Sequence, residues 1–253
     1  MENNEQVLSC ILDAGELLLT AGAEVGRVED TMGRMAHAYG FVRTDVLTIT
    51  ASVIVTARHE NGEVLTQTRR VTRRETDLAR VDRLNALSRE VCHAPLPAEE
   101  LRSRVREIAD APDCAPWQRV AAYLLIAGSF TVFFGGTLRD SIAAMLCSLL
   151  LYALGRLGQR LMLQPIVLTI MQSAAMCFAA FVTVWCGLGQ SVDKIVIGNI
   201  MLLIPGVALV TSLRDMIGGD TISGLLGACE ALLRAIAIAA GCALVLMRFG
   251  GAA

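Results

Sequence analysis

Residues 222–247 read ISGLLGACEALLRAIAIAAGCALVLM. At about 1.5 Å per residue, a helix of this length crosses the roughly 30 Å hydrocarbon core of a bilayer. Four more apolar stretches of comparable length precede it. They lie at residues 120–136, 141–157, 165–189 and 195–213. The sequence therefore predicts an α-helical integral membrane protein with about five transmembrane helices, joined by short loops and embedded in a lipid bilayer.

Charge is unevenly distributed along the chain. Hydrophobic residues make up 54% of the sequence and the mean hydropathy is +0.55, more than a water-soluble domain normally carries. Residues 1–117 hold 19 acidic and 14 basic side chains, whereas residues 118–253 hold 5 and 8. We therefore predict two domains, a cytoplasmic α+β domain over residues 1–116 and a transmembrane domain over residues 117–253.

The first half predicts the order helix, helix, hairpin, helix, helix. Helical periodicity is expected over residues 7–19, 25–39, 76–91 and 98–108, with Thr76 capping the third helix. Residues 46–58 alternate between apolar and polar, as does a strand with one buried face. Asn61-Gly62 suits a tight turn, after which residues 63–69 return as the partner strand.

The N-terminus has no basic segment leading into an apolar run, so we expect no signal peptide and a cytoplasmic first half. An odd number of spans then places the C-terminus outside. The eight cysteines show no C-x-x-C spacing, and the adjacent pair Cys92-His93 lacks the ligand spacing of a metal site. We expect neither a metal nor a cofactor.

A charged segment, TAGAEVGRVED at residues 20–30, joins the first two helices. Its simplest interpretation is a helix that ends at Gly22, followed by a new helix with solvated charges. The functional interpretation is that Glu24, Arg27 and Glu29 form a charged face that meets the membrane half or its cargo. Composition alone favours the simpler interpretation.

The fourth apolar stretch contains Pro205-Gly206, shortly after Asn199. Proline removes a backbone donor and clashes with the preceding turn, so this helix should kink or break and free carbonyl groups at membrane depth. Transporters often place binding sites at such interruptions. A kink that serves only packing is equally compatible with the sequence.

Charged and small residues gather in and after the next loop. Gly218-Gly219 should end the fourth helix, and Asp220 can cap the fifth. Glu230 and Arg234 are spaced i and i+4 and can pair inside the fifth span, where each charge costs about 2.5–3.5 kcal/mol. A pair that only locks helices together is the alternative. Ala235, Ala239 and Ala243 form a small-residue stripe suited to close packing.

Several of these segments resemble the hallmark segments of the threonine/serine exporter family. They are AGAEVGRVE at 21–29, NIMLLIPG at 199–206, Arg214-Asp215 and GDTISG at 219–224. The resemblance implies a proton-motive-force-driven exporter of small polar metabolites in the bacterial cytoplasmic membrane. Short members of the family are similar to the first half of a two-gene system, so a separate small membrane subunit is implied as partner. The resemblance does not choose between amino acids and succinate-type dicarboxylates, and oligomerisation stays open.

Roles can be suggested for the residues of the expected pathway. Arg214 or Arg234 would attract a substrate carboxylate, and Asn199 and Thr221 would offer hydrogen bonds. Asp215, Asp220 or Glu230 would carry the coupling proton. The complete candidate set for the substrate or ion pathway is Asn199, Pro205, Gly206, Arg214, Asp215, Gly219, Asp220, Thr221, Ser223, Glu230 and Arg234.

Two other classes of function were weighed. All three histidines lie in the first half, and the sequence has neither a phosphate-binding glycine loop nor a nucleophile elbow, so we expect no enzyme. We also expect no nucleic acid as partner. A regulatory or assembly subunit, whose soluble domain gates a separate conducting partner, is the alternative to an exporter subunit.

Overall fold

The computed structural model describes residues 2–49, 51–72, 75–112 and 114–249. The chain divides into two compact units, residues 1–112 with 206–229, and residues 113–205 with 230–253. The segment 206–229, which the sequence assigned to the membrane domain, thus groups by its contacts with the soluble half. The domain boundary at residue 116 stays a prediction.

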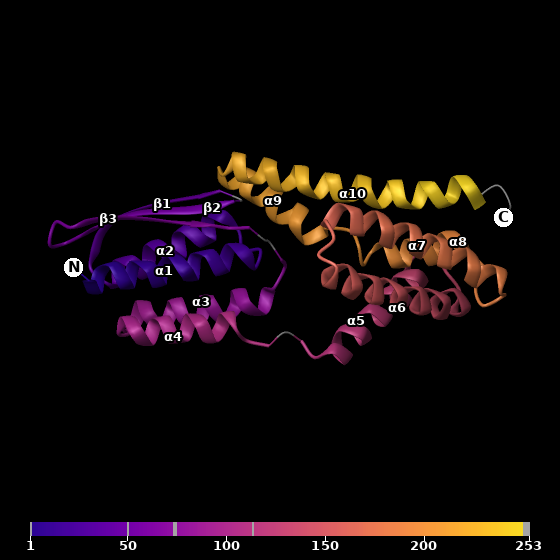
Figure 1. The fold of residues 1–253 in the computed structure, drawn as a ribbon, viewed down its shortest axis with the longest axis horizontal. Helices are drawn as coiled ribbons and strands as arrows, with labels where there is room; N and C mark the ends of the chain where they lie inside the picture. The colour runs from indigo at the N-terminus through magenta and orange to yellow at the C-terminus, as the bar shows by residue number, and fades with distance from the viewer. Residues whose placement is uncertain (1, 50, 73–74, 113, 250–253) are drawn as a thin grey trace. The chain divides into compact units, whose positions relative to one another are not determined.

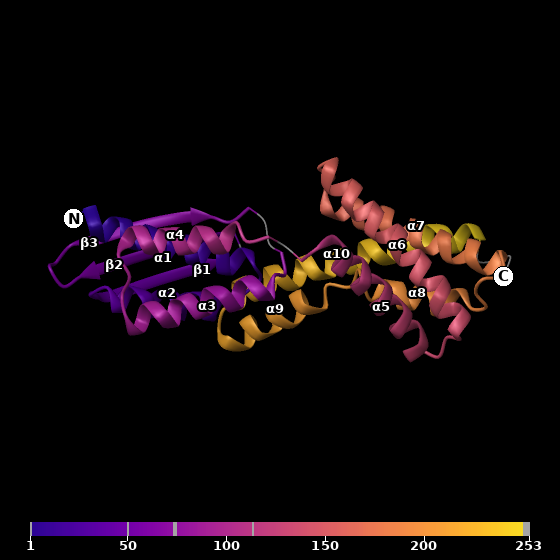
Figure 2. The ribbon, with the colours of Figure 1, turned by 90° about the horizontal axis from the view of Figure 1, so that it is seen from below.

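Within the first unit, the described residues up to 112 form a three-stranded sheet and four helices in three layers (Figures 1 and 2). The helices are α1 (Glu2–Thr20), α2 (Val25–Ala38), α3 (Leu78–His93) and α4 (Ala98–Ala109). The strands are β1 (Phe41–Ile49), β2 (Ser52–His59) and β3 (Val64–Arg70), antiparallel in the order β1-β2-β3. Helices α1 and α2 form the middle layer, with the sheet on one side and α3 and α4 on the other.

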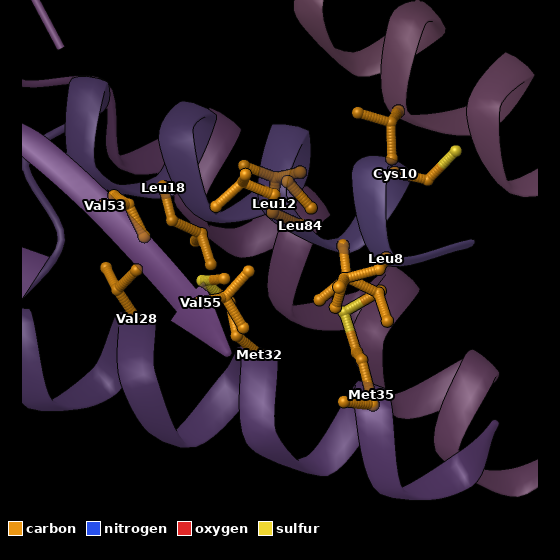
Figure 3. Close-up of a cluster of buried hydrophobic side chains, with 14 of the residues drawn as sticks. Leu8, Cys10, Leu12, Leu18, Val28, Met32, Met35, Val53, Val55 and Leu84 are labelled. Carbon is orange, nitrogen blue, oxygen red and sulfur yellow. The ribbon is translucent and has the colours of Figure 1, made fainter. Parts of the chain in front are cut away.

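The core of this unit lies between these layers. Val53 and Val55 of β2 point toward the apolar faces of α1 and α2, as Figure 3 shows. The labelled residues from the helices are Leu8, Cys10, Leu12, Leu18, Val28, Met32, Met35 and Leu84, all buried. The helical periodicity of the sequence places these side chains on one face of each helix. The order of the four predicted helices is therefore confirmed.

The predicted hairpin is right in its second half and wrong in its first. Gly62 has a φ of 87°, and β2 and β3 pair across that turn as expected. The expected single strand over 46–58 is instead two antiparallel strands, in which Ile49 pairs with Ser52. No Gly, Pro or Asn marks this reversal, and the polar and apolar alternation runs through it unbroken. Leu47, expected on the buried face, is 58% exposed.

One cap also differs from the prediction. The side chain of Asp77, one residue after the expected Thr76, accepts a hydrogen bond from the Arg80 backbone N at 2.9 Å and caps α3. Both residues are good caps, so sequence alone does not choose between neighbours.

The second unit consists of helices joined by loops, with no strand among its described residues. It contains α5 (Pro116–Phe133), α6 (Leu138–Arg160), α7 (Pro165–Trp185) and α8 (Val192–Ile200). Helix α9 (Gly206–Gly218) belongs to the first unit, and α10 (Thr221–Phe249) begins in the first unit and continues into the second.

Three helices among the described residues, α6, α7 and α10, are long and apolar enough to cross a membrane. The chain is thus a mostly helical protein of membrane character with a small sheet, but the count of five spans is not confirmed. The fourth predicted span is split, because α8 ends at Ile200 and α9 begins at Gly206. The break expected from Pro205 is confirmed. Gly219, with a φ of 104°, follows the end of α9 as expected.

Candidate functional site

The N-terminus of α2 is capped by a residue from a distant part of the chain. The backbone N of Val25 donates to Asp215 Oδ1 at 3.0 Å, and Asp215 is only 5% exposed. The residue at the cap position, Glu24, makes no capping hydrogen bond with its own side chain. A carboxylate at a helix N-terminus satisfies a free N–H group and interacts favourably with the helix dipole. Asp215 therefore ties α9 to the start of α2.

The neighbouring residue adds an ion pair to this junction. Arg214 Nη1 donates to Glu24 Oε1. The Arg214 side chain is 62% exposed, so the pair contributes little to stability by itself. Its effect is to fix orientation, because two adjacent residues of α9 now hold two adjacent residues at the start of α2.

A third contact joins α2, the end of β1 and the start of α10. Glu29 Oε1 accepts a hydrogen bond from the Thr48 backbone N at 2.7 Å. The hydroxyl of Ser223 donates to the Thr48 carbonyl oxygen at 3.3 Å. Both backbone groups of Thr48 are thus satisfied from two helices. We call these residues, Glu24, Val25, Glu29, Thr48, Arg214, Asp215, Asp220 and Ser223, the α2 junction.

Glu29 is a titratable group of the α2 junction, and its pKa is shifted. Burial raises the pKa of this carboxyl above its ordinary value, and the negative charge of Asp220 raises it further, while the Thr48 N–H opposes the shift. A carboxyl with a raised pKa exchanges its proton closer to neutral pH than an exposed one. The carboxyl with this raised pKa lies where α2 meets the end of β1.

The α9–α10 hairpin that forms one side of the junction depends on glycine. A Cβ at Gly224 would lie 2.5 Å from the Ser212 carbonyl oxygen and 2.8 Å from the Met216 backbone N. Such close backbone approach needs a residue without a side chain. The hairpin thus holds Asp215 and Ser223 in fixed positions on facing helices.

A sequence profile of the family described as "Putative threonine/serine exporter" matches residues 9–249. The chain belongs to the threonine/serine exporter family. A protein of Mycobacterium tuberculosis named "Probable threonine/serine exporter" is 24% identical over 241 residues, which cover 94% of this chain and 45% of that protein. The chain thus spans less than half the length of this relative. No solved structure matches the chain.

The two motifs that resemble this exporter family lie almost 200 residues apart, and the structure brings them together. The α2 junction contains Glu24 and Glu29 from the first motif and Arg214, Asp215, Asp220 and Ser223 from the second. Arg27 is exposed and makes no hydrogen bond or ion pair within the described residues. Gly219 lies in the turn before α10, and Thr221 is exposed at its start.

Asn199 lies in the second unit, near the end of α8. Its side chain is fully buried, and its Nδ2 donates to the Ile195 carbonyl oxygen one turn earlier at 2.9 Å. Its Oδ1 has no hydrogen-bond partner within the described residues. Pro205 and Gly206 follow directly, at the break before α9. A buried acceptor without a donor is costly, and at a functional site it points to a missing partner.

The expected pairing of Glu230 with Arg234 is wrong. Both residues are exposed, and no ion pair joins them within the described part of the chain. The i and i+4 spacing brings two side chains to the same face of a helix, but it does not bury that face. The stripe of Ala235, Ala239 and Ala243 is exposed as well.

Sequence reasoning missed Asp140, a fully buried carboxylate in the first turn of α6. Its Oδ1 accepts from the backbone N of Gln190 at 2.6 Å and of Ser191 at 2.9 Å. Its Oδ2 accepts from the Thr137 backbone N and hydroxyl at 2.9 and 2.8 Å. Asp140 thus joins the loop before α6 to the loop before α8. The capping-box spacing of Thr137 and Asp140 could have predicted the contacts between these two residues, but not those with Gln190 and Ser191.

No group of three or more His, Cys, Asp or Glu residues within the described ranges is placed to hold a metal ion.

Proposed function

We propose that this chain is a subunit of a proton-motive-force-driven exporter of small polar metabolites in the bacterial cytoplasmic membrane. The substrates are threonine/serine-type amino acids or succinate-type dicarboxylates. Family membership and the three long apolar helices support an exporter rather than an enzyme. The structural observation that most supports a substrate site is Asn199 Oδ1, a buried oxygen without a hydrogen-bond donor among the described residues, just before the break between α8 and α9.

A substrate hydroxyl or ammonium group would supply the donor that Asn199 Oδ1 lacks. The amide nitrogen is already used within α8, so the side chain is held with its oxygen available. Because this oxygen has no hydrogen bond to give up, a donor on the ligand adds one hydrogen bond without breaking another. Interrupted membrane helices are where transporters commonly build such sites.

The α2 junction supplies candidates for proton coupling. Glu29, with its raised pKa, lies close enough to Asp220 for the two charges to interact. Protonation of Glu29 would relieve that repulsion and favour the contacts that join α2 to α10. Asp215, Asp220 and Glu230 remain the other candidates for the coupling proton.

Efflux from the native host tests the proposal. Cells that lack this gene are loaded with labelled threonine, serine or succinate. They are compared with cells that carry wild type, Asn199→Ala or the control Ala228→Ser, which changes a partly buried residue of α10 outside the candidate set. We expect wild type and Ala228→Ser to restore efflux of at least one metabolite, and an uncoupler to abolish it. Asn199→Ala should lower the rate about tenfold or more, by loss of one buried hydrogen bond. Equal efflux with and without the gene would overturn the proposal.

A separate small membrane subunit is proposed as the partner. The M. tuberculosis relative is longer than the region that this chain matches, and the exposed stripe Ala235, Ala239 and Ala243 suits close packing against another membrane helix. One small apolar protein should co-purify with the tagged chain from host membranes. Substituting Ala239 by Leu should reduce its recovery, whereas Leu232→Ala should not.

A regulatory subunit is the second candidate. The α2 junction favours it, because the soluble helices hold α9 and α10 directly. Reconstitution of the chain and the partner separately and together distinguishes the two functions. Transport by the partner alone, altered in rate when the chain is added, would support regulation.

A further inference from the structure

A cavity of about 230 Å³ lies between α1 and α4 and shares no lining residue with the α2 junction. Its walls carry charges of opposite sign. Helix α1 contributes Asp13 and Glu16, and helix α4 contributes Arg102 and Arg106. Each pair is spaced by three or four residues, so that both members face the same side of their helix. The apolar part of the lining includes Leu17 and Val105.

Two of these four charged side chains already form ion pairs with residues that do not line the cavity. Asp13 pairs with Arg69 at 2.9 Å, and Arg102 pairs with Glu99 at 3.2 Å. The side chains of Glu16 and Arg106 form no ion pair or hydrogen bond within the described residues. The cavity therefore holds one carboxylate and one guanidinium, on opposite walls, that a ligand is free to engage.

The surroundings of Glu16 favour an incoming cation. The pKa of this carboxyl is raised by burial and by the neighbouring charge of Asp13. An ammonium group between the two carboxylates would offset both effects. Arg106, on the facing helix, suits a carboxylate, which a guanidinium binds through two parallel hydrogen bonds.

We propose that this cavity binds a small zwitterionic α-amino acid. Arg106 binds its carboxylate and Glu16 binds its ammonium group. The paired charges of Arg102 and Asp13 add to the field beside each, and Leu17 and Val105 contact the ligand side chain. The volume is below the roughly 300–1,000 Å³ of sites for drug-sized ligands, so the ligand is small. The binding itself does not depend on the proposed export. The role that we propose for this binding is that residues 1–112 sense the amino acid that the transporter exports. That role rests on the proposed function.

Titration calorimetry on the purified full chain in detergent tests this proposal. We expect binding of threonine or serine, and none of N-acetylthreonine or threoninamide, each of which lacks one of the two charges. Glu16→Gln and Arg106→Gln should each weaken binding about tenfold or more, since each removes a charged hydrogen bond. Two exposed residues outside the cavity give matched controls, Glu107→Gln and Arg89→Gln, which should bind as wild type does.

A cavity-filling variant guards against a general loss of folding. Ala109→Leu keeps all four charges and occupies the cavity, so it should also weaken binding while the thermal unfolding midpoint stays close to that of wild type. Unchanged threonine affinity in Glu16→Gln and Arg106→Gln would overturn the proposal. So would binding of succinate in place of the amino acids. The titration needs no transport, so failure of the export proposal leaves its result interpretable.

Discussion

The two units use large and small side chains in opposite ways. In the first unit the most buried side chains are large, among them Leu8, Leu12 and Met32. In the second unit the interior is built largely of small residues, and many large apolar side chains lie outside. The buried small residues there include Ala127, Ala143, Ala144, Cys147, Ser148, Ser173, Cys177 and Ala180.

Such a difference is expected where one set of elements meets water and the other meets lipid. In water, burial of large apolar side chains drives folding, at about 25 cal/mol per Å². In lipid that driving force is lost, and helices associate through close contact of small residues while their large side chains face the acyl chains. The polar groups follow the same rule. Ser173 and Thr183 in α7 donate to carbonyl groups of their own helix, so neither of these two hydroxyls is left unpaired.

The largest predicted effect is on a buried leucine of the first unit. Leu12→Ala removes a fully buried side chain and should cost about 2–5 kcal/mol of unfolding free energy. Leu232→Ala makes the same change on α10, where the side chain is 58% exposed, and should leave stability within about 0.5 kcal/mol. Thermal unfolding in detergent, followed by circular dichroism, compares the two. Equal losses would break the contrast between the units.

A glycine of the second unit gives the next largest effect. A Cβ at Gly198 would lie 2.8 Å from the Ala127 carbonyl oxygen and would also collide with Thr131. Gly198→Ala should therefore destabilise the packing of α8 against α5 by about 1–3 kcal/mol. Gly33→Ala in α2 meets nothing within 4 Å and should stabilise by up to about 1 kcal/mol. Resistance to proteolysis at a series of temperatures measures both changes.

The remote cap of α2 gives a smaller effect. Asp215→Ala removes the acceptor for Val25 and should cost about 0.5–2 kcal/mol, as other lost helix caps do. Asp215→Asn keeps an oxygen at the same place and should recover most of that stability. Hydrogen exchange at the first turn of α2 should rise in Asp215→Ala alone. Unchanged exchange there would show that the cap does not hold α9 to the start of α2.

The smallest predicted effect is a pH dependence at Glu29. Its pKa is raised above the ordinary value of 4.5 in the folded protein, so folding binds a proton. The stability that this group contributes is fully present below pH 4.5 and is lost as pH rises through the raised pKa. Glu29→Gln resembles the protonated form and escapes that loss. The unfolding midpoint of wild type should fall relative to Glu29→Gln as pH increases, and parallel curves would contradict the account.

Local patterns in the sequence were sufficient for much of the fold. Helical periodicity located α1 to α4, and Pro205 located the break between α8 and α9. The reversal between Ile49 and Ser52 escaped prediction, because no turn residue marks it. A turn can be located from sequence only where its residues, such as Gly, Pro or Asn, have a distinct backbone preference.

The candidate site was predicted in its parts but not in its assembly. The two motifs at 21–29 and 214–224 were recognised separately, whereas their union through Asp215 and Val25 joins residues 190 positions apart. Contacts of that kind depend on tertiary packing, which spacing does not encode. The reverse error occurred for Glu230 and Arg234, where favourable spacing suggested a pair that the fold leaves exposed and unjoined.

The central claim is that this chain forms part of a transporter for small polar metabolites. Counterflow tests it most directly, using the tagged chain purified from host membranes together with whatever subunit accompanies it. Liposomes loaded with unlabelled threonine, serine or succinate are diluted into the labelled compound. The account predicts transient accumulation of label for at least one of the three and little for the Asn199→Ala complex. No accumulation of any of them, with the wild-type complex intact and correctly inserted, would contradict it.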